Sequence, residues 1–168
     1  MIFREVQRFR QLWIYAVVIG LMLLGLWTAV QQLVLGIPFG NNPIADSWLI
    51  FLCADLLLLF PLWFYNIKMV TEVHNDGLEV RFRRLPFAKR HIQFSDIQAA
   101  EVRQYNSWLE YSGWGVRYGF GKRWAFNVSG PKGVQLILKS GQYLLIGSQQ
   151  ADELLAALEL KGVKVDND

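Results

Sequence analysis

Few side chains in this sequence have the type and spacing that catalysis or metal binding requires. The only histidines, His74 and His91, lie in segments with strand character and do not form a zinc-ligand pattern. No serine stands in a Gly-x-Ser-x-Gly context, and Cys53 is the only cysteine. Gly113-x-Gly115 lacks the third glycine of a dinucleotide loop. The sequence therefore predicts a protein that is not an enzyme and has no catalytic residue, metal or cofactor.

Two groups of residues have the character of binding surfaces instead. The first is a set of cations in a predicted hairpin: Arg81, Arg83, Arg84, Lys89 and Arg90. Near a membrane each would gain about 1 kcal/mol from anionic lipid, whereas on an edge hairpin such cations simply block aggregation. The second group is an aromatic, glycine-rich tract that contains Trp108, Tyr111 and Trp114. These rings either form a partner surface or fill the core of a small domain, and both interpretations stay open.

A third candidate is Asp55, the only charged residue between positions 48 and 67 of an apolar segment. A carboxylate at the centre of a bilayer costs roughly 2.5 kcal/mol or more, so it usually faces a partner or water. Gln31 and Gln32, which lie in the other apolar segment (12–35), are the candidate polar groups nearest to Asp55. The favoured interpretation is a hydrogen-bonded Asp55 that joins the two segments or an oligomer. The alternative is a contact to another subunit or to an ion path.

The elements that position these residues begin with two apolar segments, 12–35 and 48–67. Each has about the length that an α-helix needs to cross a bilayer. Cations precede the first segment and follow the second, while the connecting loop has no Lys or Arg. This bias predicts a membrane hairpin with both termini in the cytoplasm. Ile2, Phe3, Val6, Phe9 and Trp13 share one face of a helix, which favours an amphipathic helix at the cytoplasmic interface before the first span, or equally a segment that docks on the following domain. Residues 1–67 are therefore assigned to the membrane part.

The pattern changes after Lys68, where apolar residues alternate with polar ones. Leu78, Val80 and Phe82 alternate with polar residues after the tight-turn signal Asn75-Asp76-Gly77, which predicts a strand. Six or seven strands of this kind precede a final helix. Ser148 is the expected N-cap of that helix, which carries an apolar stripe. Residues 68–168 thus predict an α+β domain built on an antiparallel sheet and capped by a C-terminal helix. The overall prediction is a membrane α-helical hairpin plus this α+β domain.

Four segments of the second part carry a resemblance to known proteins. They are GWGVR at 113–117, AFNVSG at 125–130, GVQLIL at 133–138 and YLLIGS at 143–148. The chain resembles small prokaryotic membrane proteins that pair two transmembrane helices with a bacterial pleckstrin-homology-like (PH-like) domain. The resemblance implies an antiparallel sheet or partly open barrel with a C-terminal helix. It implies no catalytic residues, and by analogy it favours a docking or assembly platform.

These observations together predict a membrane-anchored adaptor or scaffold in the cell membrane. Its expected partners are the lipid bilayer, a protein or a second copy of the chain, and anionic phospholipid. A net charge of only +3, with both signs well mixed, does not favour nucleic acid. The alternative function is a small accessory subunit of a larger transporter, channel or other membrane complex, in which Asp55 would contact the larger subunit.

Overall fold

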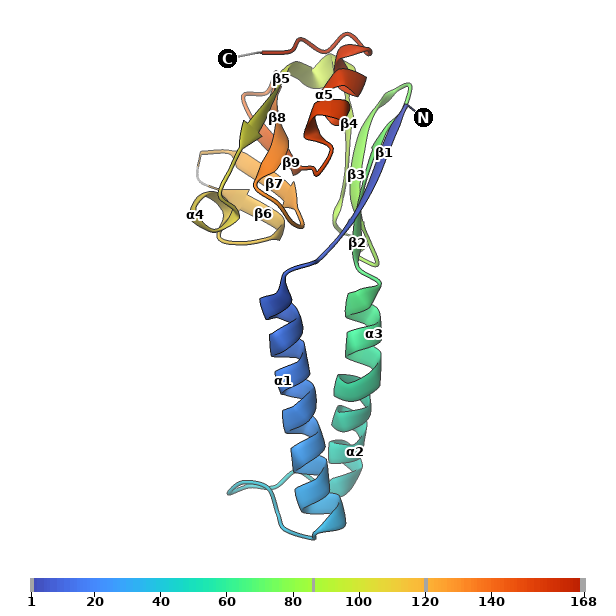
Figure 1. The fold of residues 1–168 in the computed structure, drawn as a ribbon, viewed down its shortest axis with the longest axis vertical. Helices are drawn as coiled ribbons and strands as arrows, with labels where there is room; N and C mark the ends of the chain where they lie inside the picture. Colours follow the sequence, from blue (N-terminus) through green and yellow to red (C-terminus); the bar gives the residue numbers. More distant parts are fainter. Residues whose placement is uncertain (1, 86, 120, 167–168) are drawn as a thin grey trace. The chain divides into compact units, whose positions relative to one another are not determined.

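The computed structural model describes residues 2–85, 87–119 and 121–166 and divides into two units (Figure 1). One is an apolar helical hairpin, Gln11–Asn66. The other is rich in β-strands and combines the chain up to Arg10 with the chain from Ile67 onwards. Each unit is described by itself below.

The hairpin contains two long apolar helices joined by a loop. The first comprises α1 (Leu12–Ala29) and a π-helical turn, η1 (Val30–Val34). The second comprises α2 (Asp46–Ala54), the π-helical turn η2 (Asp55–Leu59) and α3 (Phe60–Tyr65). Their lengths, 23 and 20 residues, and their composition suit a membrane span, and only 6% and 11% of their most apolar windows are buried. The two predicted apolar helices are therefore present, and their surfaces lack a protein cover in this chain.

The π-helical turn η2 has a local cause in the sequence. Pro61 stands in the first turn of α3 and has no N–H to donate to the preceding turn. The N–H of Phe60 instead donates to the carbonyl of Asp55, five residues earlier. Such wide turns are rare and accommodate an interruption of the normal hydrogen-bond ladder without ending the helix. The helix therefore continues through Pro61.

The N-terminal segment is a strand, so the amphipathic helix predicted there is wrong. β1 (Phe3–Arg8) pairs antiparallel with β2 (Lys68–Val73) in the register Phe3↔Val73 to Arg8↔Lys68. Its inward residues are Phe3, Glu5 and Gln7, and all three are buried. Because two of the three inward residues are polar, hydropathy alone does not reveal that inward and outward residues alternate along this strand. These residues belong to the β-rich unit, whereas the sequence had placed them with the hairpin.

The β-rich unit contains two sheets. The first has the order β1-β2-β3-β4, with β3 (Gly77–Arg83) and β4 (Lys89–Gln93), and all its pairs are antiparallel. The turn η3 (Phe94–Asp96) leads into the second sheet, β5-β8-β9-β7-β6. Its strands are β5 (Ile97–Gln104), β6 (Gly115–Gly119), β7 (Arg123–Asn127), β8 (Lys132–Leu138) and β9 (Tyr143–Gly147).

The second sheet departs from the antiparallel prediction in one pair. β9 returns beside β8 as a hairpin and then lies next to β7, to which it is parallel. The turn after β7 leads the chain away to β8, so β9 takes the place between β7 and β8. Over the described ranges the two sheets remain separate and form no closed barrel. The coarse prediction of a strand-rich domain is thus confirmed, while the purely antiparallel sheet is wrong.

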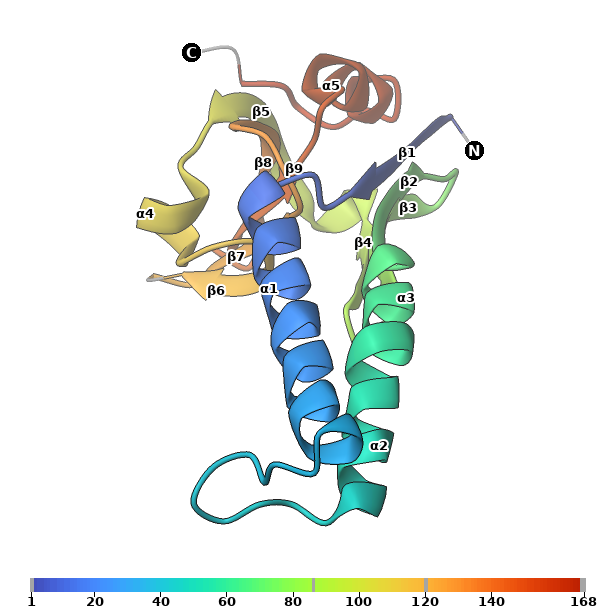
Figure 2. The same ribbon diagram turned by 60° about the horizontal axis from the view of Figure 1, so that its bottom comes forward.

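The core lies between the sheets and beneath the C-terminal helix. α5 (Ala151–Glu159) buries Leu154 and Leu158 and contacts strands of both sheets (Figure 2). Phe82 of the first sheet stacks on Phe126 of the second, with 6.4 Å between ring centroids. The predicted C-terminal helix is confirmed, although it begins at Ala151, and the hydroxyl of Ser148 accepts the N–H of Gln150 just before it. Each sheet therefore has one face covered by the rest of this unit.

Candidate functional site

The predicted basic hairpin is largely neutralised by neighbouring acids. Arg81 donates to Glu72 at 3.2 Å and pairs with Glu79 at 3.1 Å. Lys89 pairs with Glu79 at 3.1 Å. Arg4 also reaches Glu72, at 3.1 Å. These residues form an ion-pair network on the outer face of the first sheet, so Arg81 and Lys89 do not present an uncompensated charge.

Arg90 lies apart from the other hairpin cations, on the opposite face of the sheet. Its guanidinium donates to the side chain of Gln142 at 2.9 Å and stacks over the ring of Trp124, 5.9 Å from the centroid. Partial burial lowers the pKa of Arg90 below its usual value. Arg90 therefore connects the two sheets of the unit and does not join the surface that the sequence suggested.

Arg83 and Arg84 are the hairpin cations that remain exposed. Within the described ranges neither side chain makes a hydrogen bond or an ion pair. Arg84 has a φ of 77°, a left-handed conformation that ends β3. The register places Arg83 directly opposite Lys68, which is opposite Arg8. This cross-strand group was not predicted, because its members are about 60 and 15 residues apart in the sequence and meet only through strand pairing.

The aromatic tract separates into an exposed part and a buried part. It contains a short helix, α4 (Ser107–Tyr111), whose first turn is capped by the side chain of Asn106, which accepts the N–H groups of Trp108 and Leu109 at 3.0 and 3.1 Å. The rings of Trp108 and Trp114 meet edge to face at 5.2 Å. Trp108 is 58% exposed and Leu109 85% exposed. The pair of tryptophans predicted as a partner surface is therefore brought together by the fold.

Tyr111, the third predicted member of that surface, is buried in the core, so it is not part of an exposed patch. It is 2% exposed and packs edge to face against Tyr105 at 6.3 Å. Tyr118, which the sequence had not singled out, takes its place on the surface: it is 62% exposed and its ring contacts that of Trp124 at 5.0 Å. We call Trp108, Leu109, Trp114 and Tyr118 the aromatic surface.

Beneath the aromatic surface, Arg103 connects α4 to the second sheet. It donates to Glu110 at 2.8 Å, to Gln135 at 3.1 Å and to the hydroxyl of Tyr111 at 3.2 Å. Burial alone would lower the pKa of Arg103, but the hydrogen bond and charge of Glu110 raise it. Burial would likewise raise the pKa of Glu110, but its hydrogen bond with Arg103 lowers it. Both groups are therefore held in their charged forms, which suits a structural ion pair.

The polar residues of the hairpin do not form the predicted cluster. Gln32 donates to the carbonyl of Ile44 at 2.6 Å and to the carboxylate of Asp46 at 2.7 Å, at the loop end. Gln31 accepts the N–H of Ile37 through its backbone carbonyl. Asp55 is exposed, and no hydrogen bond or ion pair reaches its carboxylate from any residue that the structure describes. Asp55 therefore does not join the two helices within one chain.

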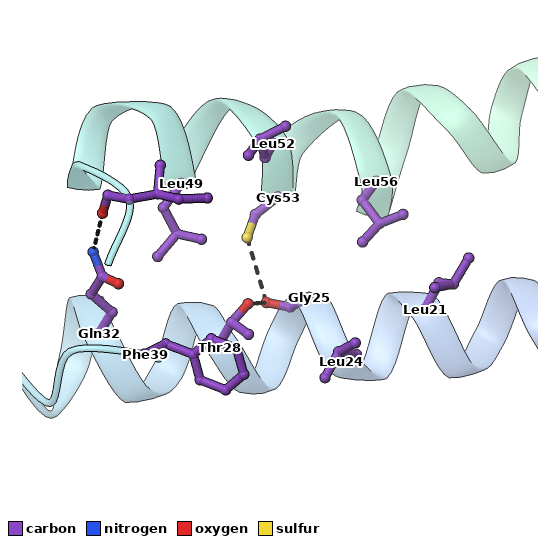
Figure 3. Close-up of a pocket in the computed structure, with 11 residues that line it drawn as sticks. Leu21, Leu24, Gly25, Thr28, Gln32, Phe39, Leu49, Leu52, Cys53 and Leu56 are labelled. Carbon is purple, nitrogen blue, oxygen red and sulfur yellow. Dashed lines mark hydrogen bonds between the residues drawn. The ribbon is translucent and has the colours of Figure 1, made fainter. Parts of the chain in front are cut away.

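The two apolar helices are in close contact at Gly25. A Cβ atom there would lie 2.8 Å from Cδ2 of Leu56, and the thiol of Cys53 donates to the Gly25 carbonyl at 3.4 Å. An apolar cavity of about 250 Å³ lies beside this contact, and Figure 3 shows Thr28 and Phe39 among its lining side chains. The cavity walls are almost entirely apolar, so this region packs the hairpin.

In the ranges that the structure covers, no group of three or more His, Cys, Asp or Glu residues is placed to hold a metal ion. Comparison with protein families gives one result: the model of a family of unknown function, DUF6141, matches residues 1–163. The chain belongs to this family. In DUF6141 the matched region spans both the hairpin and the β-rich unit, so the two form one family architecture. No curated protein matches the sequence.

Proposed function

We propose that this DUF6141 protein is a non-enzymatic, membrane-anchored adaptor. The hairpin fixes the chain in the cell membrane, and the β-rich unit is a PH-like platform that binds a protein partner at the cytoplasmic surface. The observation that carries the proposal is the joining of two exposed apolar helices to a unit with a complete core of its own. Anchoring a binding unit in this way raises its effective concentration toward membrane partners.

The charge distribution supports the orientation in this proposal. Arg4, Arg8 and Arg10 precede α1, and Lys68, Arg81 and Arg83 follow α3. The connecting loop between the helices contains no Lys or Arg. Cytoplasmic flanks of membrane spans carry an excess of these residues. Both termini are accordingly assigned to the cytoplasm and the loop to the outside.

The aromatic surface supports a protein partner. It lies on α4 and on β6, which is an edge strand of the second sheet. Exposed tryptophan and tyrosine side chains are enriched in protein interfaces because they bury a large area at low entropic cost. An edge strand also presents unpaired backbone groups that a partner strand can use. The two packed sheets with α5 support the PH-like assignment, although the parallel β7–β9 pair is a departure from an antiparallel sheet.

Thiol labelling of intact cells tests the anchoring and the orientation. Asn42→Cys in the loop and Asp166→Cys near the C-terminus are made separately in a Cys53→Ser background. A membrane-impermeant maleimide is expected to label position 42 in intact cells and position 166 only after lysis. Labelling of position 166 in intact cells, or recovery of the chain in the soluble fraction without detergent, would contradict the proposal.

Site-specific photo-crosslinking in membranes tests the partner surface. A photoreactive residue replaces Tyr118 in one protein and Leu160, which is 78% exposed on the β-rich unit, in a matched control. A discrete crosslinked product is expected at position 118 only, and the Trp108→Ala/Trp114→Ala change should abolish it. Absence of a product at position 118, or the same product at both positions, would exclude the aromatic surface as the docking site.

A second function, an accessory subunit of a larger membrane complex, is favoured by Asp55. The carboxylate lies near the middle of Asp46–Tyr65 and is exposed on the hairpin. In a bilayer such a group needs a polar partner from another chain. Co-purification in mild detergent separates the two functions. A stoichiometric partner lost with Asp55→Asn, but kept with Trp108→Ala/Trp114→Ala, would identify a subunit, and the reverse pattern would identify the adaptor.

A further inference from the structure

The turn between β3 and β4 carries a fully exposed aromatic side chain. Phe87 is 99% exposed, more than any other large apolar side chain in the described ranges. The turn is itself hydrogen-bonded: the N–H of Phe82 donates to the carbonyl of Ala88 at 2.8 Å, and the N–H of Ala88 donates to the carbonyl of Leu85 at 3.0 Å. Phe82 and Ala88 are both buried. The fold therefore fastens the base of the turn to the core and leaves the ring of Phe87 in solvent.

Two exposed cations lie beside Phe87 in the same turn. Arg83 is the last residue of β3, and Arg84 follows it in a left-handed conformation. Among the residues that the structure describes, no hydrogen bond or ion pair reaches either side chain. Lys89, at the start of β4, pairs instead with Glu79. We call Arg83, Arg84 and Phe87 the β3–β4 tip, which combines positive charge with an exposed apolar ring.

We propose that the β3–β4 tip docks on the membrane surface, with the ring of Phe87 at the boundary between headgroups and acyl chains and the two arginines on the phosphates of anionic phospholipids. The inference rests on the proposed membrane anchoring and names the part of the β-rich unit that contacts lipid. An apolar ring gains free energy by leaving water. Guanidinium groups donate charge-assisted hydrogen bonds to phosphate oxygens. A lipid surface offers both environments at adjoining depths.

Strand register places the tip at the end of the sheet from which the chain continues into the apolar helices. Arg83 lies directly opposite Lys68, the first residue of β2, and α3 ends at Tyr65, three positions earlier. A residue advances the chain by at most about 3.6 Å, and neighbouring strands are about 4.8 Å apart, so the backbone of Arg83 is within roughly 16 Å of the end of α3. A bilayer that contains α3 therefore has its headgroups within reach of the tip. The turn at Asp76 lies at the opposite end of β2 and β3.

Charge and position favour lipid over the other occupants of the tip. If two copies of the chain associated through Phe87, the arginines of both copies would face each other, and like charges repel. A soluble protein would have to cover the ring at the end of the sheet that chain connectivity holds near the headgroups. An anionic lipid surface meets neither obstacle and attracts cations that lie close to it.

Site-specific photo-crosslinking tests the tip in the full-length protein. The photoreactive residue p-benzoylphenylalanine replaces Phe87 in one protein and Asp76 in the matched control. Its side chain keeps the aromatic, apolar character of Phe87, and the exposed position means that the replacement disturbs no packing. Each protein is irradiated in vesicles that contain equal amounts of phosphatidylglycerol and phosphatidylcholine, and also in cell membranes, where other proteins are present. Intact-mass spectrometry distinguishes an adduct with either lipid from an adduct with protein.

A phospholipid adduct is expected at position 87 and not at position 76, and phosphatidylglycerol adducts should outnumber phosphatidylcholine adducts. One cation near an anionic surface contributes roughly fivefold in affinity, so Arg83→Gln/Arg84→Gln should lower this ratio by up to roughly 25-fold. Lys139→Gln/Lys164→Gln removes the same charge from other exposed positions of the β-rich unit and should leave the ratio unchanged. Arg83→Lys/Arg84→Lys preserves the charge and should keep the ratio, which separates a charge effect from misfolding.

Four results would overturn the inference: no lipid adduct at position 87, equal lipid adducts at positions 87 and 76, a lipid ratio that Arg83→Gln/Arg84→Gln leaves unchanged, or a protein adduct in place of lipid at position 87 in cell membranes. Alkaline carbonate extraction of cell membranes separates this failure from failure of the proposed function. Protein that stays in the extracted membranes but gives no lipid adduct at position 87 would refute the tip alone. Protein released by carbonate would refute the anchoring on which the tip depends.

Discussion

The β-rich unit buries its large apolar side chains, whereas the hairpin leaves most of its own exposed. Leu78, Leu136 and Leu154 in the β-rich unit are completely buried, whereas Leu58 and Leu62 in the hairpin are 68% and 63% exposed. The first unit therefore encloses its own core against water, and the second leaves its apolar surface to be covered by its surroundings. In a single chain, burial thus distinguishes a part that encloses its own core from a part whose apolar surface has little cover within the chain.

Polar groups show the same contrast. In the β-rich unit the buried Glu5 accepts the hydroxyl of Ser148 and the N–H of Gln149, at 2.5 and 2.9 Å. This places β1, at the start of the chain, against the beginning of α5, near its end. In the hairpin, Asp55 has no such partner among the residues that the structure describes. The β-rich unit thus pairs a buried carboxylate internally, while the carboxylate of Asp55 is exposed and has no partner among the described residues.

The largest effect expected is the loss of a core leucine from the β-rich unit. Leu144 is completely buried, so Leu144→Ala should lower the free energy of unfolding of this unit by about 2–5 kcal/mol. Leu58→Ala in the hairpin creates no cavity within the chain and should leave that free energy unchanged. Urea denaturation of the full chain in mild detergent, followed by circular dichroism, measures both, and equal losses would contradict the contrast.

Two glycines provide a comparison of close packing. A Cβ atom at Gly133 would lie 2.6 Å from the backbone oxygen of Ile146, so Gly133→Ala must shift a strand and should cost about 1–3 kcal/mol. At Gly25 the obstacle is the flexible end of Leu56, which can turn aside. Gly25→Ala should therefore cost much less in the same denaturation experiment. A larger effect at Gly25 would show that the hairpin packs as rigidly as the sheets.

The Glu5 cluster should hold β1 in place. Glu5→Ala leaves the hydroxyl of Ser148 and the N–H of Gln149 without their acceptor, at a cost of about 1–3 kcal/mol. Hydrogen–deuterium exchange of the amides in Phe3–Arg8 should become faster. Val6→Ala, on the exposed side of the same strand, is the control and should change the exchange little. Unchanged exchange in Glu5→Ala would mean that strand pairing alone retains β1.

The Arg103–Glu110 pair predicts a pH dependence confined to the β-rich unit. Because the folded protein lowers the pKa of Glu110, its ionised form stabilises the fold above the ordinary value of 4.5. That contribution is lost as the pH falls through the folded pKa. Glu110→Gln should remove about 0.2–1 kcal/mol near neutral pH and nothing in strong acid. Thermal melts at several pH values test this, and a difference that grows toward acid would contradict it.

The smallest effect expected concerns Lys68 and Arg83, which lie directly opposite each other on β2 and β3. Lys68→Gln relieves repulsion from Arg83 and should stabilise the unit by about 0.2–1 kcal/mol. Lys89→Gln, which breaks the pair with Glu79, should not stabilise it. Added salt should reduce the gain from Lys68→Gln because it screens exposed charges. Destabilisation by Lys68→Gln would show that the charge of Lys68 is already compensated within the protein.

Local sequence patterns were sufficient to predict the elements that depend on neighbouring residues. The apolar helices and α5 follow from composition and periodicity, and the turn at Asn75-Asp76-Gly77 is found between β2 and β3. β1 was misread because its inward face contains Glu5 and Gln7, whose partners lie about 140 residues away. For Tyr111 the sequence left core and surface both open, and the choice is made by α4, a helix of only five residues that turns Trp108 outward and Tyr111 inward.

By itself, the amino-acid sequence determined that this chain has two apolar helices and a strand-rich unit, since composition and alternation are properties of neighbouring residues. Only the tertiary structure decided which side chains meet: Arg8 with Lys68 and Arg83, Glu5 with Ser148, and Trp108 with Trp114. Strand register and helix orientation are set by burial of a whole face at once, so a pattern in one segment cannot specify its neighbours in another.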